Sequence, residues 1–295
     1  MKDHWHSTAN GPVYARHWGD PDLPVLLMLH GFPEYSGAWS DLAPYLSTHF
    51  HCIAPDQRGY GQTGGPDDVT AYATGALTRD MADLITGLGR GPITVLGHDW
   101  GAAVAYNLAM RSPDLVDRLI IANGVHPVPF QTALAAGGAQ SQASQYIDWL
   151  RAEGSEDVLA ADNYAKLRAL FAAHMDMSWL SGDTLEAYVT EWSRPGRLKT
   201  MVHWYRASPV QVAKPGQPII GLPDYPIDKL TVHQPHLLIW GENDTAILPE
   251  ATEGLETYAP HLTRVSLAEA DHWLAHQKPA EVARIILEWT GVRNT

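Results

Sequence analysis

The sequence is poor in cysteine and in positive charge, and it has no long apolar run. Its single cysteine, Cys52, excludes a disulfide within the chain, and apolar neighbours indicate a small buried side chain. The 20 Lys and Arg against 33 Asp and Glu give a net charge of −13, which argues against a nucleic-acid or anionic-membrane partner. No apolar stretch approaches the roughly 20 residues that a membrane-spanning helix needs.

The remaining composition is that of an ordinary globular protein. With 45% hydrophobic and 18% charged residues, the 295 residues can bury a sizeable core, as one large domain with an insertion or as two domains. Residues 1–6 lack the apolar centre of a signal peptide, so we expect a cytoplasmic protein. Composition gives no oligomeric state, and a homodimer stays open.

Short apolar runs alternate with segments of helical spacing along most of the chain. A hairpin is expected around Asn10-Gly11, because this pair suits a tight turn between two strands. Further strands are expected at 24–30, 51–54, 92–96, 118–122, 236–240 and 263–267, and helices at 78–88, 102–110 and 279–289. Strands that are apolar throughout and alternate with helices predict an α/β fold with a mostly parallel central sheet flanked by helices on both faces.

This alternation stops between residues 127 and 228. The segment is helical in pattern and rich in aromatic residues, without a convincing strand, and its last part, 209–226, carries five prolines. We interpret it as an inserted helical lid, or cap domain, that returns through an irregular loop. The predicted division is therefore a core of residues 1–126 and 229–295 and a cap of residues 127–228.

The most informative feature is an aspartate in a sharp glycine turn. Asp99 lies at the centre of residues 97–101, Gly-His-Asp-Trp-Gly, between an expected strand and an expected helix. This strand-turn-helix context is typical of a nucleophile elbow, in which most hydrolases carry serine. An aspartate is already ionised near neutral pH and can displace a leaving group from an sp3 carbon, leaving an alkyl ester on the protein. The sequence therefore indicates an opened epoxide or a displaced halide rather than an ordinary ester.

An aspartate nucleophile needs a histidine that activates water, and a carboxylate that orients the histidine. His272 follows the last expected strand, and Asp244 follows the strand before it, in the order expected on this fold. The end of the 118–122 strand is another place for the acid, but it holds Asn123, which carries no charge. Asp271 is adjacent to His272 in sequence and so points elsewhere.

Hydrolysis of the ester develops an oxyanion that backbone N–H groups must bind. Trp100, the residue after Asp99, supplies one such group. Phe32, in the turn that follows the 24–30 strand, is placed to supply the other. His30 and His98, which flank these two turns, are interpreted as structural hydrogen-bonding residues.

Three motifs resemble the soluble epoxide hydrolases of the α/β-hydrolase superfamily. They are residues 30–34 (His-Gly-Phe-Pro-Glu), 56–61 (Asp-Gln-Arg-Gly-Tyr-Gly) and the aspartate elbow, and the match continues to the region of His272. The resemblance implies the α/β-hydrolase fold, conversion of an epoxide to a vicinal diol, and no metal or cofactor. It also implies two lid tyrosines that donate to the epoxide oxygen, which carry over to Tyr205 and Tyr146. Relatives often have proline where this chain has Glu153.

The expected substrate is a small apolar epoxide, with water as the second reactant, because the predicted lid is aromatic. Trp100, Phe32 and Trp149 are expected to contact it.

Two other readings remain. A haloalkane dehalogenase would share Asp99 and Trp100 but needs a second donor to the halide, from Trp149 or Trp179, because Phe32 replaces that family's asparagine. A ligand-binding protein on the same fold would lack catalysis. The particular epoxide, the carbon attacked and the preferred enantiomer are not readable from the sequence.

Overall fold

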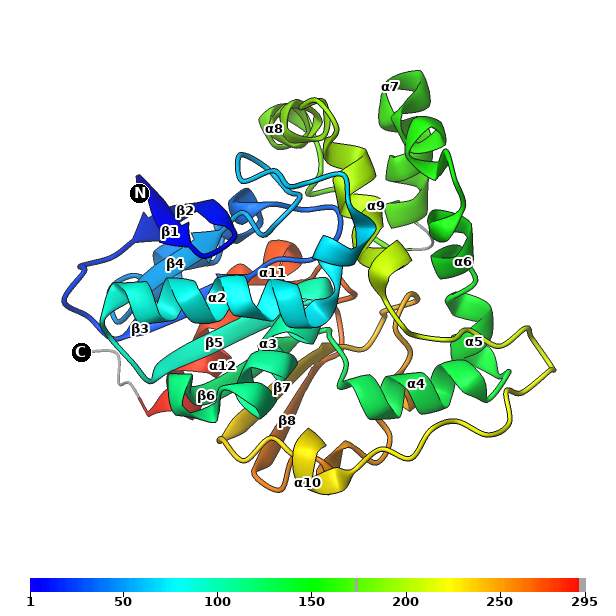
Figure 1. Cartoon of the computed structure of the whole chain (residues 1–295). Helices are drawn as coiled ribbons and strands as arrows, with labels where there is room; N and C mark the ends of the chain where they lie inside the picture. Colours follow the sequence, from blue (N-terminus) through cyan, green and yellow to red (C-terminus); the bar gives the residue numbers. More distant parts are fainter. Residues whose placement is uncertain (173–174, 292–295) are drawn as a thin grey trace.

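The computed structural model describes residues 1–172 and 175–291, and an eight-stranded sheet forms its centre, in the order β1-β2-β4-β3-β5-β6-β7-β8 (Figure 1). The strands are β1 (Lys2–Thr8), β2 (Gly11–Trp18), β3 (Val25–Leu29), β4 (His51–Pro55), β5 (Ile93–His98), β6 (Val116–Ala122), β7 (His236–Gly241) and β8 (Leu262–Leu267). β1 and β2 form the expected antiparallel hairpin, and β2 pairs antiparallel with β4. All other pairs are parallel.

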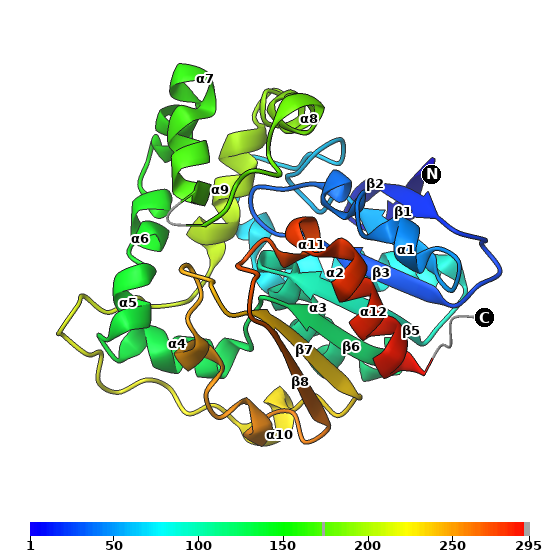
Figure 2. The same ribbon diagram turned by 180° about the vertical axis from the view of Figure 1, so that it is seen from behind.

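Helices cover both faces of this sheet. The helices other than α4 to α9 are α1 (Ala43–Leu46), α2 (Thr74–Leu88), α3 (Trp100–Arg111), α10 (Ile227–Leu230), α11 (Leu274–Gln277) and α12 (Pro279–Thr290). Short 3-10 helices span Ser36–Trp39, Val69–Tyr72, Pro113–Leu115, Pro249–Thr252 and Leu255–Thr257. α2 and α3 lie on the face seen in Figure 1, and α1, α11 and α12 on the opposite face (Figure 2).

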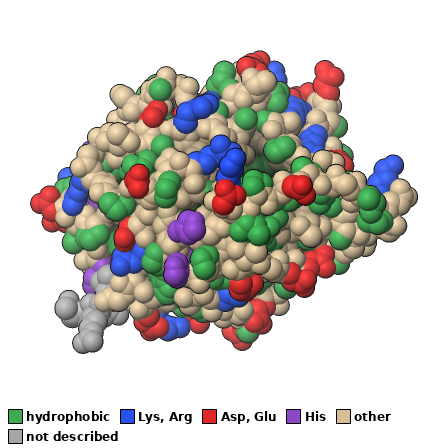
Figure 3. All heavy atoms as spheres, turned by 60° about the horizontal axis from the view of Figure 1, so that its bottom comes forward, with side chains coloured by type: hydrophobic (Ala, Val, Ile, Leu, Met, Phe, Trp, Pro, Cys, Tyr) green, Lys and Arg blue, Asp and Glu red, His purple; other side chains and the backbone are tan. Residues whose placement is uncertain are grey.

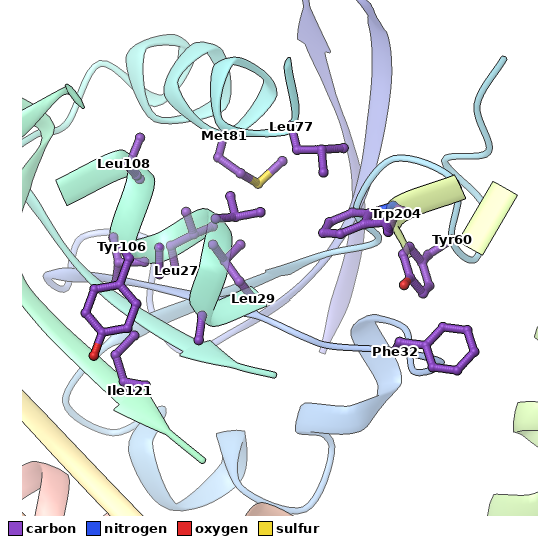
Figure 4. Close-up of a cluster of buried hydrophobic side chains, with 14 of the residues drawn as sticks. Leu27, Leu29, Phe32, Tyr60, Leu77, Met81, Tyr106, Leu108, Ile121 and Trp204 are labelled. Atoms are coloured by element: carbon purple, nitrogen blue, oxygen red, sulfur yellow. The ribbon is translucent and has the colours of Figure 1, made fainter. Parts of the chain in front are cut away.

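Each face of the sheet buries its own hydrophobic cluster. Leu27 and Leu29 of β3 pack with Met81 of α2 and Leu108 of α3 on one face (Figure 4). The alternate residues of the same strand, such as Leu26, belong to the cluster under α1 and α12. Because successive strand residues point to opposite faces, burial of both faces requires a strand that is apolar throughout.

The predicted fold class is confirmed, and the limits of the strands differ by one or two residues from the expected ones. β5 begins at Ile93 rather than at Pro92, because proline has no N–H to donate to a neighbouring strand. β8 is not apolar throughout: Thr263, Arg264 and Ser266 are exposed, because this strand lies at the edge of the sheet.

The aromatic-rich segment forms helices between β6 and β7. They are α4 (Pro127–Ala135), α5 (Ala139–Ala143), α6 (Tyr146–Arg151), α7 (Ser155–Ala172), α8 (Gly182–Trp192) and α9 (Arg197–Ala207). α7 contains a kink, since its residues 161–164 are not helical. These helices gather where β5, β6 and β7 end, and an irregular segment returns from α9 to α10. The division into a core and a cap domain stays a prediction.

Within residues 1–172 and 175–291, no helix is long and apolar enough to cross a membrane. On the face drawn in Figure 3, acidic and basic side chains are interspersed, and no basic patch stands out (Figure 3). The cytoplasmic location and the homodimer remain predictions.

Candidate active site

Asp99 lies in a strained turn that only its glycine neighbours permit. It joins β5 to α3 with φ 49° and ψ −121°, a backbone conformation that L residues rarely adopt. A Cβ on Gly101 would lie 2.0 Å from the carbonyl oxygen of Leu29, and one on Gly97 would lie 2.7 Å from the carbonyl oxygen of Gly101. The close approach of β3, β5 and α3 therefore requires glycine at both positions, and it presents the Asp99 side chain at the end of the sheet.

The turn after β3 binds one oxygen of this carboxylate. The backbone N–H of Phe32 donates to Asp99 Oδ1 over 2.6 Å. Gly31 allows this approach, since a Cβ there would lie 2.3 Å from the Asp99 side chain. Trp100 is the first residue of α3, so its N–H has no partner within the helix. Both expected oxyanion donors thus lie at the Asp99 turn.

His272 and Asp244 reach the same place from the ends of β8 and β7. His272 Nδ1 lies 2.7 Å from Asp244 Oδ2, and His272 Nε2 lies 3.8 Å from Asp99 Oδ2. Asp244 Oδ1 accepts the backbone N–H groups of Ala246 and Ile247, at 2.8 and 2.9 Å, which fix the carboxylate. The structure therefore brings the three predicted residues together in one row.

The charges in this row depend on one another. Burial opposes the charged form of His272, but Asp244, Asp99 and the more remote Glu34 outweigh this effect and raise the pKa of the imidazole to about 9. Burial likewise opposes the charge on Asp244, but His272 and the donors to its oxygens lower the pKa of this carboxyl below its usual value. His272 is therefore an imidazolium between two carboxylates near neutral pH.

Tyr146 and Tyr205 face Asp99 from the inserted helices. Tyr205, on α9, is buried with its ring edge-on to the rings of Phe32 and Trp100, both at 5.1 Å between centroids. Tyr146 begins α6, with its ring centroid 6.2 Å from that of Tyr205. Arg151 of α6 donates to the carbonyl oxygen of Tyr205 over 3.0 Å and so ties the two helices together.

Both phenols are held in their protonated form. Loss of water contact raises the pKa of Tyr146 well above its usual value, and the negative charges of Asp99 and Asp244 add to the shift. The same loss, followed by the effects of Tyr146 and Asp99, raises the pKa of Tyr205. Both hydroxyls are therefore available as hydrogen-bond donors over the whole ordinary pH range.

Two cavities meet at this cluster, and Asp99, Tyr146 and Tyr205 line both. The smaller, of about 180 Å³, is lined further by Phe32, Ala143, Leu170, Phe171, Met175, Thr245, Ala246, His272 and Trp273. The larger, of about 610 Å³, runs along α3 and α4 to the return segment, past Trp100, Val128, Pro209 and Tyr225. Both walls are mainly apolar, as expected for a site that binds apolar ligands.

Trp149 does not join this cluster. It lines neither cavity, and its ring lies under the ammonium group of Lys166, 5.6 Å from the ring centroid. Trp179 also lies outside both cavities, stacked on His276 at 3.8 Å between centroids. Neither Trp149, expected to contact the substrate, nor Trp179, the other candidate for the second halide donor of a dehalogenase, therefore lines the two cavities at Asp99.

Sequence reasoning missed a buried carboxylate behind the site. Glu34 accepts hydrogen bonds from Tyr188 of α8 and from His276, at 2.9 and 2.7 Å, and contacts His98 at 3.2 Å. Burial opposes its charge, but His276 and His98 lower the pKa of Glu34 below its usual value. His98 in turn contacts the carbonyl oxygen of His272 at 2.9 Å, which agrees with a structural part for this histidine. Glu34 was visible as the last residue of the 30–34 motif, but its partners come from remote segments.

Asn123 was excluded as the acid, and its actual contacts were not foreseen. Its side chain is fully buried and donates to Asp244 Oδ2 over 2.7 Å. The only signal in the sequence was its position at the end of a predicted strand beside the elbow.

Comparisons with known proteins agree with this geometry. The family model for the alpha/beta hydrolase fold matches residues 24–279. The chain is 32% identical over 273 residues to the AB hydrolase superfamily protein YfhM of Bacillus subtilis (strain 168), covering 92% of this chain and 91% of that protein. It is 30% identical to human Epoxide hydrolase 4, covering 93% of this chain and 74% of that protein.

Solved structures give the same result. An epoxide hydrolase found in metagenomes from hot environments superposes with a TM-score of 0.88 at 32% identity, over 98% of both chains. The Bacillus megaterium epoxide hydrolase in complex with an inhibitor gives a TM-score of 0.86 at 30% identity, over 98% of this chain and 100% of that chain. With its aspartate elbow and its tyrosine pair, the chain belongs to the epoxide hydrolase family of the α/β-hydrolase superfamily.

Proposed function

We propose that this protein hydrolyses an apolar epoxide to a vicinal diol through an alkyl ester on Asp99. One observation supports the proposal most: the Asp99 carboxyl group, two phenols and an imidazole that is paired with Asp244 line one largely apolar cavity. The names of the relatives agree with this chemistry. In this proposal residues 127–228 act as the cap that carries both phenols, and residues 1–126 and 229–295 form the core.

In the first step, Asp99 attacks one carbon of the epoxide ring. Phe32 N–H holds Oδ1, so Oδ2, the oxygen nearer His272, forms the new bond to carbon. The departing oxygen would become an alkoxide. An alkoxide is far more basic than a phenoxide, since a phenol has a pKa of about 10. Tyr146 and Tyr205 therefore stabilise this oxygen and one of them protonates it.

In the second step, His272 activates water. Esterification removes the charge of Asp99, and with it one of the charges that keep His272 protonated. His272 can then give its proton to the phenoxide left by the first step, which restores that tyrosine. The neutral imidazole accepts a proton from water, and the hydroxide attacks the ester carbonyl carbon. Phe32 N–H and Trp100 N–H bind the oxyanion. Cleavage of the acyl–oxygen bond then transfers the proton of the new carboxyl group to the departing oxygen, which releases the diol and restores the Asp99 carboxylate.

The first test concerns the covalent ester. Wild-type protein incubated with a styrene-type epoxide is expected to form the diol, and to release no bromide from a bromoalkane. His272→Gln should stop turnover after the first step, because nothing then activates water, and intact mass should show the protein plus one substrate. Asp99→Asn is the control that forms no adduct. Rapid diol turnover by His272→Gln, or bromide release as the main reaction, would contradict the proposal.

The second test concerns the phenols. Tyr146→Phe and Tyr205→Phe should each slow attack on the epoxide by about 100-fold, because each removes one donor to the developing alkoxide. Rapid-quench measurement of the ester formed in a single turnover reports this rate. Tyr164→Phe is a matched control, since Tyr164 is a tyrosine of the inserted helices that lines neither cavity. A loss of the same size in the control would show that the two hydroxyls have no special part.

The third test concerns the charge of His272. The imidazole should titrate with a pKa of about 9 in the free protein, and below that in Asp99→Asn, whose amide is uncharged like the ester. The sign follows from the contribution of Asp99, which favours the imidazolium. NMR of the histidine ring signals measures both midpoints without substrate. An unchanged midpoint would mean that ester formation cannot release His272 as a base.

The position of Asp99 between two unequal cavities also indicates the shape of the substrate. One ring carbon can place its substituent in the larger cavity and the other in the smaller, so epoxides substituted on both carbons fit the site. Ala143 lines only the smaller cavity, and Val128 only the larger.

Filling one cavity should therefore discriminate between substrates. Ala143→Phe is expected to lower kcat/KM at least about 10-fold for an epoxide substituted on both carbons, because the added ring occupies the space of the smaller substituent. A terminal epoxide should change by less than about threefold, since its only substituent uses the larger cavity. Val128→Phe is the matched variant and should impair both substrates. Equal losses for both substrates in Ala143→Phe would count against the two-sided site.

A further inference from the structure

Asn123 lies between the elbow and the loop that carries Asp244, and it touches both. It follows β6 with φ 36°, a left-handed conformation that asparagine tolerates better than most residues, and it is fully buried. Its carbonyl oxygen accepts the backbone N–H of Asp99 at 3.4 Å. Its side-chain oxygen accepts the N–H of Gly241 at 2.7 Å, and its side-chain nitrogen lies 2.7 Å from Asp244 Oδ2 and 3.4 Å from the carbonyl oxygen of Gly241.

Only a side chain that both donates and accepts satisfies this position. An apolar residue would leave the N–H of Gly241 unpaired in a buried place, and an ionised aspartate would put a second carboxylate against Asp244. The amide avoids both. Moreover, the oxygen to which it donates, Asp244 Oδ2, is the same oxygen that faces His272 Nδ1 at 2.7 Å.

We propose that Asn123 is a positioning residue for ester hydrolysis: by donating to Asp244 Oδ2, it aims that carboxylate at His272 and limits how strongly it holds the proton of His272. The inference rests on the proposed function for its kinetic part. Asn123 touches neither substrate nor reacting atoms, and it acts through Asp244.

The direction of the effect follows from sharing one oxygen between two donors. A carboxylate oxygen that already accepts the amide is a weaker base toward the imidazole, and the contact with Asn123 is one of those that lower the pKa of Asp244. The other groups facing His272 are Asp99, Glu34 and the ring of His98, 4.7 Å away between centroids. Since Asn123 contacts none of their side chains, its removal should change only the contribution of Asp244.

The test is Asn123→Gly, which removes the amide and suits the left-handed backbone. The titration midpoint of the His272 ring should move to higher pH, and the rate of ester hydrolysis at pH 7 should fall about 10-fold. This is the lower end of the effect that hydrogen bonds to the ligating side chains have at metal sites. Attack on the epoxide should stay within about twofold of the wild type. Hydrolysis should recover in part above the new midpoint, because more His272 is then neutral.

Asn243→Ala is the matched control. Asn243 is also next to Asp244, but its side chain is exposed and donates to the carbonyl oxygen of Ala268, at 3.2 Å. It should leave the midpoint and both rates unchanged. If Asn123→Gly instead slows both steps equally at every pH with an unmoved midpoint, Asn123 is merely structural and the inference is overturned.

A measurement on the unmodified protein does not depend on folding of the variant. The side-chain amide protons of Asn123 should shift with pH at the same midpoint as the ring of His272, because both groups share Asp244 Oδ2. Independent titration would overturn the inference. These NMR measurements need no substrate, so the two proposals can fail separately. If the wild type forms no diol, the proposed function is refuted, and the shift of the Asn123 amide protons still tests whether Asn123 acts on His272 through Asp244.

Discussion

The structure depends on holding one carboxylate where little water reaches it. The side chain of Asp99 is only 15% exposed, and a polar group in such a place needs partners that replace its contacts with water. Two partners do so: the N–H of Phe32 on one oxygen, and the imidazole of His272 near the other. The glycines at 31, 97 and 101 serve this arrangement, because any side chain there would separate the elbow from the turn that donates to it.

In the proposed mechanism, Asp99 and His272 divide the reaction into two steps with opposite requirements. A nucleophile is best served by a neighbouring cation that keeps it ionised, whereas a general base must be neutral. One histidine can meet both demands only because the first step removes the charge that opposes the second. Asp244 remains charged throughout, so His272 keeps its orientation while its proton affinity falls. In this mechanism, the strength of the contact between Asp244 and His272 sets the proton affinity that His272 keeps. The hydrogen-bond donors to Asp244 therefore affect how readily His272 acts as a base.

The sequence predicted those parts of the site that follow from strand order. Asp99, Asp244 and His272 each follow a strand, and the carboxyl ends of parallel strands meet at one edge, so their proximity could be inferred without coordinates. Tyr205 and Tyr146 could be named only by resemblance, because the packing of α6 on α9 decides which helix faces are turned toward Asp99. The same packing removes Trp149 from the cavities. The contacts of Glu34 and Asn123 join residues far apart in sequence through single hydrogen bonds, and no periodicity reports such contacts.

The apolar walls also limit what substitution could improve. Burial keeps both phenols protonated and strengthens every hydrogen bond that they make to the substrate. It equally opposes the charges of Asp244 and Glu34, and each of these carboxylates has partners that stabilise its charge. Glu34 shows that this holds beyond the reacting groups, since the turn that donates to Asp99 is itself held by a buried charge with three partners. A substitution that makes the site more apolar without adding a hydrogen-bond donor would therefore favour the uncharged form of a buried carboxylate. This loss would outweigh any gain in the hydrogen bonds that the two phenols make to the substrate.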